Sequence, residues 1–114
     1  MNINDEVIIM MKELKIPAHP TPVGEMLTEE FLIPLEVSQG QLARAMGVSR
    51  KTVNELCVGR RSVTVETALL LSKVLGTTSG FWLNLQIMND MWQAQHNESF
   101  TEKLDHAARL VEVA

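Results

Sequence analysis

Apolar residues recur along this chain at spacings of three and four positions, which is the spacing of one face of an α-helix. Alternation of apolar and polar residues, the pattern of a half-buried strand, is never sustained. We therefore predict an all-α fold. From the apolar faces and the residues that start and stop helices, we expect helices at 4–15, 22–33, 39–46, 50–57, 65–75, 79–95 and 99–112.

Prolines divide the chain into parts. Three of the four lie in residues 16–22, and because proline restricts its own φ and disfavours helix at the preceding residue, an extended connector is predicted there. The expected organisation is an N-terminal helical arm over 1–16, a compact five-helix domain over 17–96 and a C-terminal helix over 97–114. The fourth proline, Pro34, is predicted to stop the helix that begins at Pro22.

The centre of the chain contains two short predicted helices joined by a tight turn. Ser38 and Gln41 match a capping box at the start of the first helix, and Gly47 suits the left-handed position that ends it. Only Val48 separates Gly47 from Ser49, which is a good cap for the second helix. This spacing is typical of a helix-turn-helix, in which the N-terminal end of the second helix enters the major groove of DNA.

The outward face of the second helix carries side chains that can read base edges. Arg50 or Lys51 can donate to O6 and N7 of guanine, and Asn54 can pair bidentately with adenine. Glu55 has two open roles, because it can accept a hydrogen bond from cytosine or pair with Lys51 one turn earlier. The expected partner is therefore double-stranded DNA.

Polar residues around this helix suit the phosphate backbone. The Ser49 and Thr52 hydroxyls can bond phosphate, and Gln39 lies at the positive end of the preceding helix. Arg60 and Arg61 follow the second helix and can neutralise phosphate charge. The complete predicted DNA-binding set is Gln39, Ser49, Arg50, Lys51, Thr52, Asn54, Arg60 and Arg61.

Charge is distributed unevenly along the sequence. The net charge of −4 argues against a general nucleic-acid coat. Residues 38–61, however, carry five basic residues against one acid, whereas 1–37 carry two against seven and 62–114 carry three against six. A basic segment between acidic flanks is an electrostatic footprint of phosphate binding, so it supports the same interpretation.

Several other functional classes are disfavoured. A length of 114 residues allows one domain, and no apolar run approaches the roughly 20 residues of a membrane-spanning helix. The single cysteine, Cys57, cannot form an internal disulfide, so we expect a cytoplasmic protein without a membrane partner. Because His19, His96 and His106 share no ligand spacing and no nucleophile motif or Gly-rich phosphate loop occurs, we expect no enzyme, no cofactor and no metal site.

Five stretches within residues 24–95 carry a family resemblance. They are GEML at 24–27, EFL at 30–32, GVSR at 47–50, TALLL at 67–71 and, most specific of all, LGTTSGFWLNLQ at 75–86. This pattern resembles the HigA-type (VapI-like) antitoxins, which are helix-turn-helix proteins of the phage-repressor class. The resemblance covers about two thirds of the chain and implies a phage-repressor-like domain.

The resemblance, rather than the residue chemistry, implies a second partner. HigA-type antitoxins of type II modules neutralise a HigB-like, mRNA-cleaving toxin by direct binding, and they repress their own operon. Two alternatives remain open. The chain could be a stand-alone dimeric repressor without a toxin, or a protein-interaction module whose helix-turn-helix no longer reads DNA.

The predicted helix 79–95 has a wider apolar arc than one core contact needs. One face holds Phe81, Leu85, Met88 and Trp92, an adjacent face holds Leu83, Ile87, Met91 and Ala94, and the polar arc holds Gln86, Asn89, Asp90 and Gln93. We predict a homodimer with Leu83, Ile87 and Met91 in its interface, because a two-fold axis places two recognition helices on a pseudo-palindrome. The alternative is that the C-terminal helix folds back over this face.

The remaining amphipathic helices supply further expectations. We assign toxin binding to Val7, Met11 and Leu14 in the arm, with the C-terminal helix 99–112 as a second candidate and docking onto the protein's own domain as the alternative. The C-terminal helix is predicted to begin with a capping box at Ser99 and Glu102. In helix 65–75 we expect these residues to face inward: Val65, Ala68, Leu69, Leu71, Val74 and Leu75.

Overall fold

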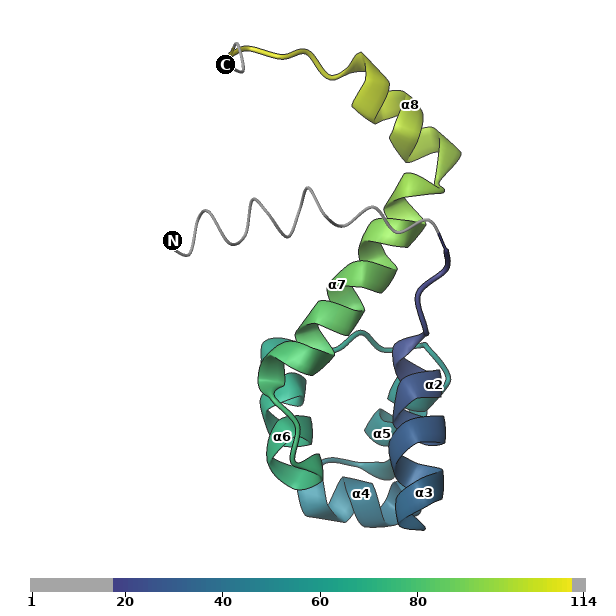
Figure 1. Ribbon diagram of the computed structural model, residues 1–114, viewed down its shortest axis with the longest axis vertical. Coiled ribbons are helices and arrows are strands. Elements are labelled where there is room, and N and C mark those ends of the chain that lie inside the picture. Colours follow the sequence, from purple (N-terminus) through teal and green to yellow (C-terminus); the bar gives the residue numbers. More distant parts are fainter. Residues whose placement is uncertain (1–17, 112–114) are drawn as a thin grey trace.

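The computed structural model describes residues 18–111, and this part of the chain is all-helical. A first continuous helix consists of α2 (Val23–Leu27), a π-helical turn η1 (Thr28–Leu32) and α3 (Ile33–Leu35). It is followed by α4 (Gln39–Met46), α5 (Arg50–Cys57), α6 (Val65–Leu75), α7 (Ser79–Gln95) and α8 (Glu98–His106). The continuous first helix and α4 to α7 form a five-helix body, and α8 extends from the far end of α7 (Figure 1). The predicted all-α, five-helix body is confirmed.

The first helix differs from the prediction at both ends. Pro22 is the residue before the helix, which begins at Val23. The helix also does not stop at Pro34: the Ile33 N–H donates to the carbonyl of Thr28, five residues back, so a widened turn lies directly before the proline. The helix ends at Leu35, and the residue that follows it, Glu36, adopts a left-handed φ of 54°. The prediction was wrong because proline breaks the regular i→i−4 pattern, which this turn has already left.

The core lies where the first helix meets α5 and α7. Its fully buried large side chains are Leu27, Leu42, Val53, Leu56, Leu71 and Trp82. Trp82 also satisfies its indole N–H, which donates to Oγ1 of Thr77 at 2.7 Å. Gly24 is buried directly against the end of α5: a Cβ built on it would lie 2.0 Å from the carbonyl oxygen of Cys57. Glycine is therefore required for these two helices to approach as they do.

The inward face of α6 is narrower than expected. Ala68 and Leu71 are buried and Val74 and Leu75 are half-buried, but Val65 is 61% exposed and Leu69 is 54% exposed. Apolar residues occur on every side of this helix, so periodicity could not identify which of them face the core. The inward placement of Val65 and Leu69 was wrong.

The prediction of which face of α7 packs against the core was also wrong. Trp82 and Leu85 face the core, and so does Asn89, which was expected in the polar arc but is only 8% exposed. The Asn89 side-chain amide donates to the carbonyls of Leu85 at 2.8 Å and Thr21 at 2.9 Å. The connector thus crosses α7 at this position and brings a carbonyl that needs a buried donor.

Residues 18–22, the described part of the connector, run along α7 without regular secondary structure. The ring centroids of His19 and Trp92 lie 4.1 Å apart, and the His96 ring stacks on Trp92 with a centroid separation of 4.0 Å. Pro20 is buried. With the Asn89 hydrogen bond, these contacts fix the point at which the chain joins the domain.

The last helix is shorter than expected and is capped by a different residue. Asn97, and not Ser99, is the cap: its Oδ1 accepts the N–H of Phe100 at 3.0 Å and the Ser99 hydroxyl at 2.9 Å. The helix ends at His106 rather than at 112, and its apolar residues Phe100 and Leu104 stay 44% and 58% exposed. Because none of residues 98–106 is buried, no tertiary packing within the described part of the chain stabilises additional helical turns.

The C-terminal helix does not fold back over α7. Figure 1 shows α8 continuing away from the body beyond the end of α7. Ile87, in the middle of α7, is 42% exposed. The predicted arm over 1–16, with Val7, Met11 and Leu14, lies outside the described residues, and the domain limits stay a prediction.

Candidate nucleic-acid interface

The predicted helix-turn-helix forms with the expected boundaries. The capping box between Ser38 and Gln41 is present at the start of α4, and Gly47 ends α4 in the left-handed region with φ 73°. The Val48 N–H donates to the Ala43 carbonyl at 3.0 Å, which closes the turn. Since Leu42, Ala43 and Met46 of α4 and Val53 and Leu56 of α5 are buried together, the two helices form a rigid pair.

The N-terminal end of α5 is held by hydroxyl contacts. Ser49 Oγ accepts the Thr52 N–H at 3.1 Å and lies 2.9 Å from Thr52 Oγ1. One of the two hydroxyl protons is used in that second contact. The other stays available, so the pair can give one hydrogen bond to a phosphate without losing the cap.

A hydrogen bond links the two helices on their outer surface. Asn54 Nδ2 donates to Gln39 Oε1 at 3.1 Å. Asn54 keeps its Oδ1 and a second N–H, which is the acceptor and donor pair that bidentate contact with adenine requires. Gln39 keeps both of its own N–H groups, which can donate to a phosphate. The single contact therefore orients both side chains and leaves both predicted roles possible.

Among the described residues, the basic side chains of this surface divide into those without an ion pair, Arg50 and Arg60, and those paired with Glu55, which are Lys51 and Arg61. Arg50 is exposed, and the Lys51 side chain is 85% exposed. Arg60 is exposed in the loop after α5, and its backbone N–H donates to the Glu55 carbonyl at 2.8 Å. Within residues 18–111, Arg50 and Arg60 make no ion pair, so their charges are available to a polyanion.

Glu55 pairs with two of the predicted DNA-binding residues. Lys51 Nζ lies 3.9 Å from Oε1 of Glu55, which matches the i,i+4 alternative. Arg61 Nε and Nη2 lie 3.0 and 2.9 Å from Oε2. Sequence reasoning missed this second pair, because Arg61 lies beyond the end of the helix, where helical spacing predicts no contact. A DNA contact by Arg61 stays a prediction.

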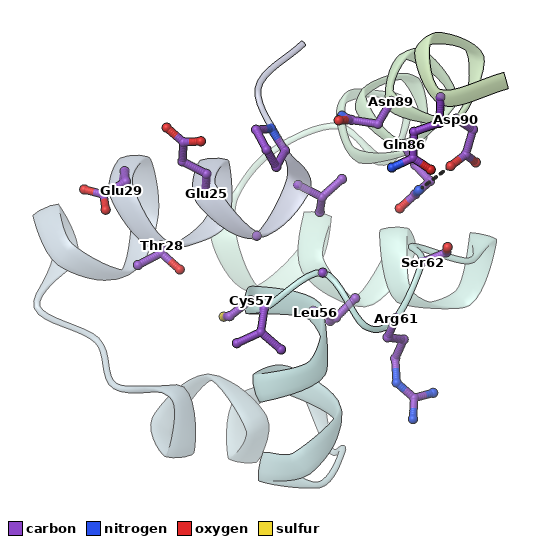
Figure 2. Close-up of a pocket in the computed structure, with 16 residues that line it drawn as sticks. Glu25, Thr28, Glu29, Leu56, Cys57, Arg61, Ser62, Gln86, Asn89 and Asp90 are labelled. Atoms are coloured by element: carbon purple, nitrogen blue, oxygen red, sulfur yellow. Dashed lines mark hydrogen bonds between the residues drawn. The ribbon is translucent and has the colours of Figure 1, made fainter. Parts of the chain in front are cut away.

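A separate groove of about 480 Å³ lies between α2, the end of α5 and α7. Figure 2 shows Glu25 and Glu29 on one side, Gln86 and Asp90 on the other, and the Arg61 guanidinium directed away from it. Cys57 lines its floor; burial raises the pKa of its thiol, and a hydrogen bond with Thr28 offsets part of that rise. The groove lies apart from the start of α5.

The predicted dimer residues are distributed unevenly over α7. Ile87 is 42% exposed, Met91 is half-buried, and Leu83 is half-buried against the core. Only Ile87 of the three is thus largely available to a partner.

Comparison with known proteins identifies the family. Residues 29–83 match the helix-turn-helix family. The chain is 44% identical over 85 residues to an uncharacterised helix-turn-helix transcriptional regulator of Haemophilus influenzae, covering 75% of this chain and 79% of the relative. It is 43% identical over 82 residues to antitoxin HigA-1 of Vibrio cholerae, covering 72% of this chain and 77% of that protein. The chain belongs to the HigA-type antitoxin family.

The likeness to this family extends to three dimensions. The structure of the antitoxin GraA in complex with its operator superimposes with a TM-score of 0.75 at 40% identity, covering 83% of this chain and 95% of GraA. HigA-type proteins are DNA-binding regulators and antitoxins rather than enzymes. Between residues 18 and 111 no three histidine, cysteine or acidic side chains group as metal ligands. In the same part of the chain, no helix combines the length and apolar character that crossing a membrane requires.

Proposed function

We propose that this HigA-type protein is the antitoxin of a type II module. It binds operator DNA as a homodimer, represses its own operon and neutralises a HigB-like, mRNA-cleaving toxin by direct contact in the cytoplasm. The observation that carries the DNA-binding half is the exposed start of α5, where Gln39 holds Asn54 in position beside Arg50 and Lys51.

The geometry supports base reading as well as charge attraction. A rigid α4–α5 pair presents a side chain with paired donor and acceptor at the surface, next to two exposed cations. GraA, which shares this fold at 40% identity, has been determined with its operator. We therefore assign sequence-specific contacts to Arg50, Lys51 and Asn54, and backbone contacts to Gln39, Ser49, Thr52, Arg60 and Arg61.

The homodimer is supported by α7. Ile87 leaves an apolar surface uncovered, with Met91 beside it one turn later, and α8 does not cover it. A two-fold axis there pairs identical surfaces. Ile87→Glu should convert the dimer to a monomer in analytical ultracentrifugation, whereas Gln93→Glu, at an exposed position on another side of the same helix, should not. A dimer that survives the Ile87 substitution would place the interface elsewhere.

The toxin-binding half is supported by the relative named antitoxin HigA-1. We assign this contact to Val7, Met11 and Leu14. The stand-alone repressor remains the second candidate, because another relative of similar identity is named as a transcriptional regulator.

The DNA-binding half is tested with two double variants. Arg50→Ala/Lys51→Ala removes two charges from α5, and Lys73→Ala/Lys103→Ala removes two from α6 and α8. Each is titrated by fluorescence anisotropy into a duplex from immediately upstream of the coding sequence and into a shuffled duplex. Since a lost base contact costs about 1–3 kcal/mol, the first variant should bind the upstream duplex at least about tenfold more weakly. Unchanged affinity in that variant, or equal loss in both, would refute the assignment.

The toxin half is tested by co-expression. The small reading frame adjacent to this gene is expressed alone, with the full chain, and with a chain lacking residues 1–16. The proposal expects growth arrest by the neighbour alone, rescue and co-purification with the full chain, and loss of both with the shortened chain. A harmless or absent neighbour would leave the repressor without a toxin.

A further inference from the structure

The recognition helix carries one carboxylate, and its position is unusual. Glu55 is the single acid in residues 38–61, which hold five basic residues. Its side chain is 21% exposed and lies one helical turn after Lys51, on the same face of α5. Both of its oxygens face cations: Oε1 lies 3.9 Å from Nζ of Lys51, and Oε2 accepts a hydrogen bond from Nε of Arg61 at 3.0 Å and lies 2.9 Å from Nη2 of the same residue.

This arrangement makes two cations less available to phosphate. A guanidinium that donates a hydrogen bond to a carboxylate and forms an ion pair with it is held in place, and a phosphate must compete for it. The Glu55 carboxylate itself can only accept hydrogen bonds, so it repels phosphate oxygens nearby. Arg50 and Arg60, by contrast, have no carboxylate partner among the described residues.

We infer that Glu55 is a specificity-determining residue of the DNA-binding surface, acting as a counter-ion that weakens binding to DNA of unrelated sequence. The inference rests on the proposed function. Binding to unrelated DNA is almost wholly electrostatic, and its register is free, so released cations can each find a phosphate. In the specific complex, base contacts by Arg50, Lys51 and Asn54 fix the register, so a released Arg61 is less free to reach a phosphate than it is on unrelated DNA. Glu55 therefore lowers unrelated binding more than operator binding.

The test compares Glu55→Gln with Glu66→Gln. Both variants lose one negative charge, but Glu66 is exposed in the first turn of α6 and has no ion pair within residues 18–111. Affinities for the upstream and shuffled duplexes are measured between 50 and 200 mM salt, and circular dichroism confirms that each variant is folded. Because one phosphate contact changes the salt slope by about 0.9, Glu55→Gln should steepen the slope on shuffled DNA by about 1–2.

Affinity for the shuffled duplex should rise by about tenfold near 0.1 M salt, and the ratio of upstream to shuffled affinity should fall. Glu66→Gln should leave that ratio unchanged. Adding Arg61→Gln to Glu55→Gln should return most of the gained affinity if Arg61 is the released cation. A ratio and slope in Glu55→Gln equal to those of Glu66→Gln would overturn the inference, as would a double variant that keeps the full gain.

The proposed function and the role of Glu55 can be refuted separately. A wild-type protein that binds upstream and shuffled duplexes equally refutes the proposed function, and the inference with it. A wild-type protein that discriminates, together with a Glu55→Gln variant that discriminates equally well, refutes the role of Glu55 alone.

Discussion

Replacing Gly24 with alanine gives a direct test of the closest helix contact in the core. The new Cβ would lie 2.0 Å from the Cys57 carbonyl oxygen, 2.6 Å from the Cys57 carbonyl carbon and 2.8 Å from the Leu56 carbonyl oxygen. Ordinary contact begins near 3.4 Å, so the first of these is about 1.4 Å too short. All three atoms are backbone, and no side chain can rotate away to relieve the clash.

The magnitude follows from this geometry. The first helix and α5 must separate by about 1 Å, which loosens the packing of Leu27 and Leu56, both fully buried. Overpacking of this kind costs about 1–3 kcal/mol, and the better helix propensity of alanine returns up to about 1 kcal/mol. Because no flexible atom absorbs the clash, we expect the upper end of that range, a net loss of about 2 kcal/mol. For a domain of this size the melting temperature should fall by about 10 °C.

The assay is thermal and urea unfolding followed by circular dichroism at 222 nm. Gly40→Ala is the matched control: it makes the same change inside α4, where a Cβ meets nothing closer than 3.9 Å. That variant should be as stable as the wild type or more stable by up to about 1 kcal/mol. If Gly24→Ala unfolds at the wild-type midpoint, the close approach of the two helices is wrong.

Two further predictions concern groups buried beside α7 and α5. Asn89→Ala should lower the free energy of unfolding by about 1–3 kcal/mol, because the Thr21 carbonyl loses its hydrogen-bond donor. Asn84→Ala, on the exposed side of α7, should leave the free energy of unfolding unchanged. Equal stability of the two variants in urea unfolding would contradict the buried hydrogen bond. Because burial raises the pKa of the Cys57 thiol, its contribution is complete below pH 9.0, the ordinary pKa, and is lost as pH rises through the folded value. Cys57→Ala should therefore lose less stability than the wild type between pH 8 and pH 10 in urea unfolding, and an identical loss would show that the thiol does not contribute.

Local chemistry made most of the helix boundaries predictable. Ser38, Ser49 and Thr64 accept backbone N–H groups as caps, and Gly47 and Gly76 adopt left-handed φ values at helix ends. These features were predictable because each depends only on residues three or four positions away. The same locality explains why the helix-turn-helix was recognisable from residue types and spacing alone.

Features that depend on distant residues could not be predicted in this way. Asn89 looked polar and therefore exposed, but its partner Thr21 is 68 positions away. The burial of Trp82 and the contact of Glu55 with Arg61 likewise depend on residues outside their own helical turns. Pro34 failed for a different reason, since the π-helical turn that precedes it leaves no mark in a hydrophobicity pattern.

The two tryptophans occupy surroundings different enough to serve as independent optical reporters. Trp82 is fully buried among phenylalanine rings, whereas Trp92 contacts the imidazoles of both His19 and His96, where the chain joins the domain. Replacing either indole with phenylalanine would leave a protein with a single emitter. Emission from Trp82 would then follow unfolding of the interior, and emission from Trp92 would follow release of the connector. A ligand that pulls His19 away from α7 would thus be visible in one signal and silent in the other.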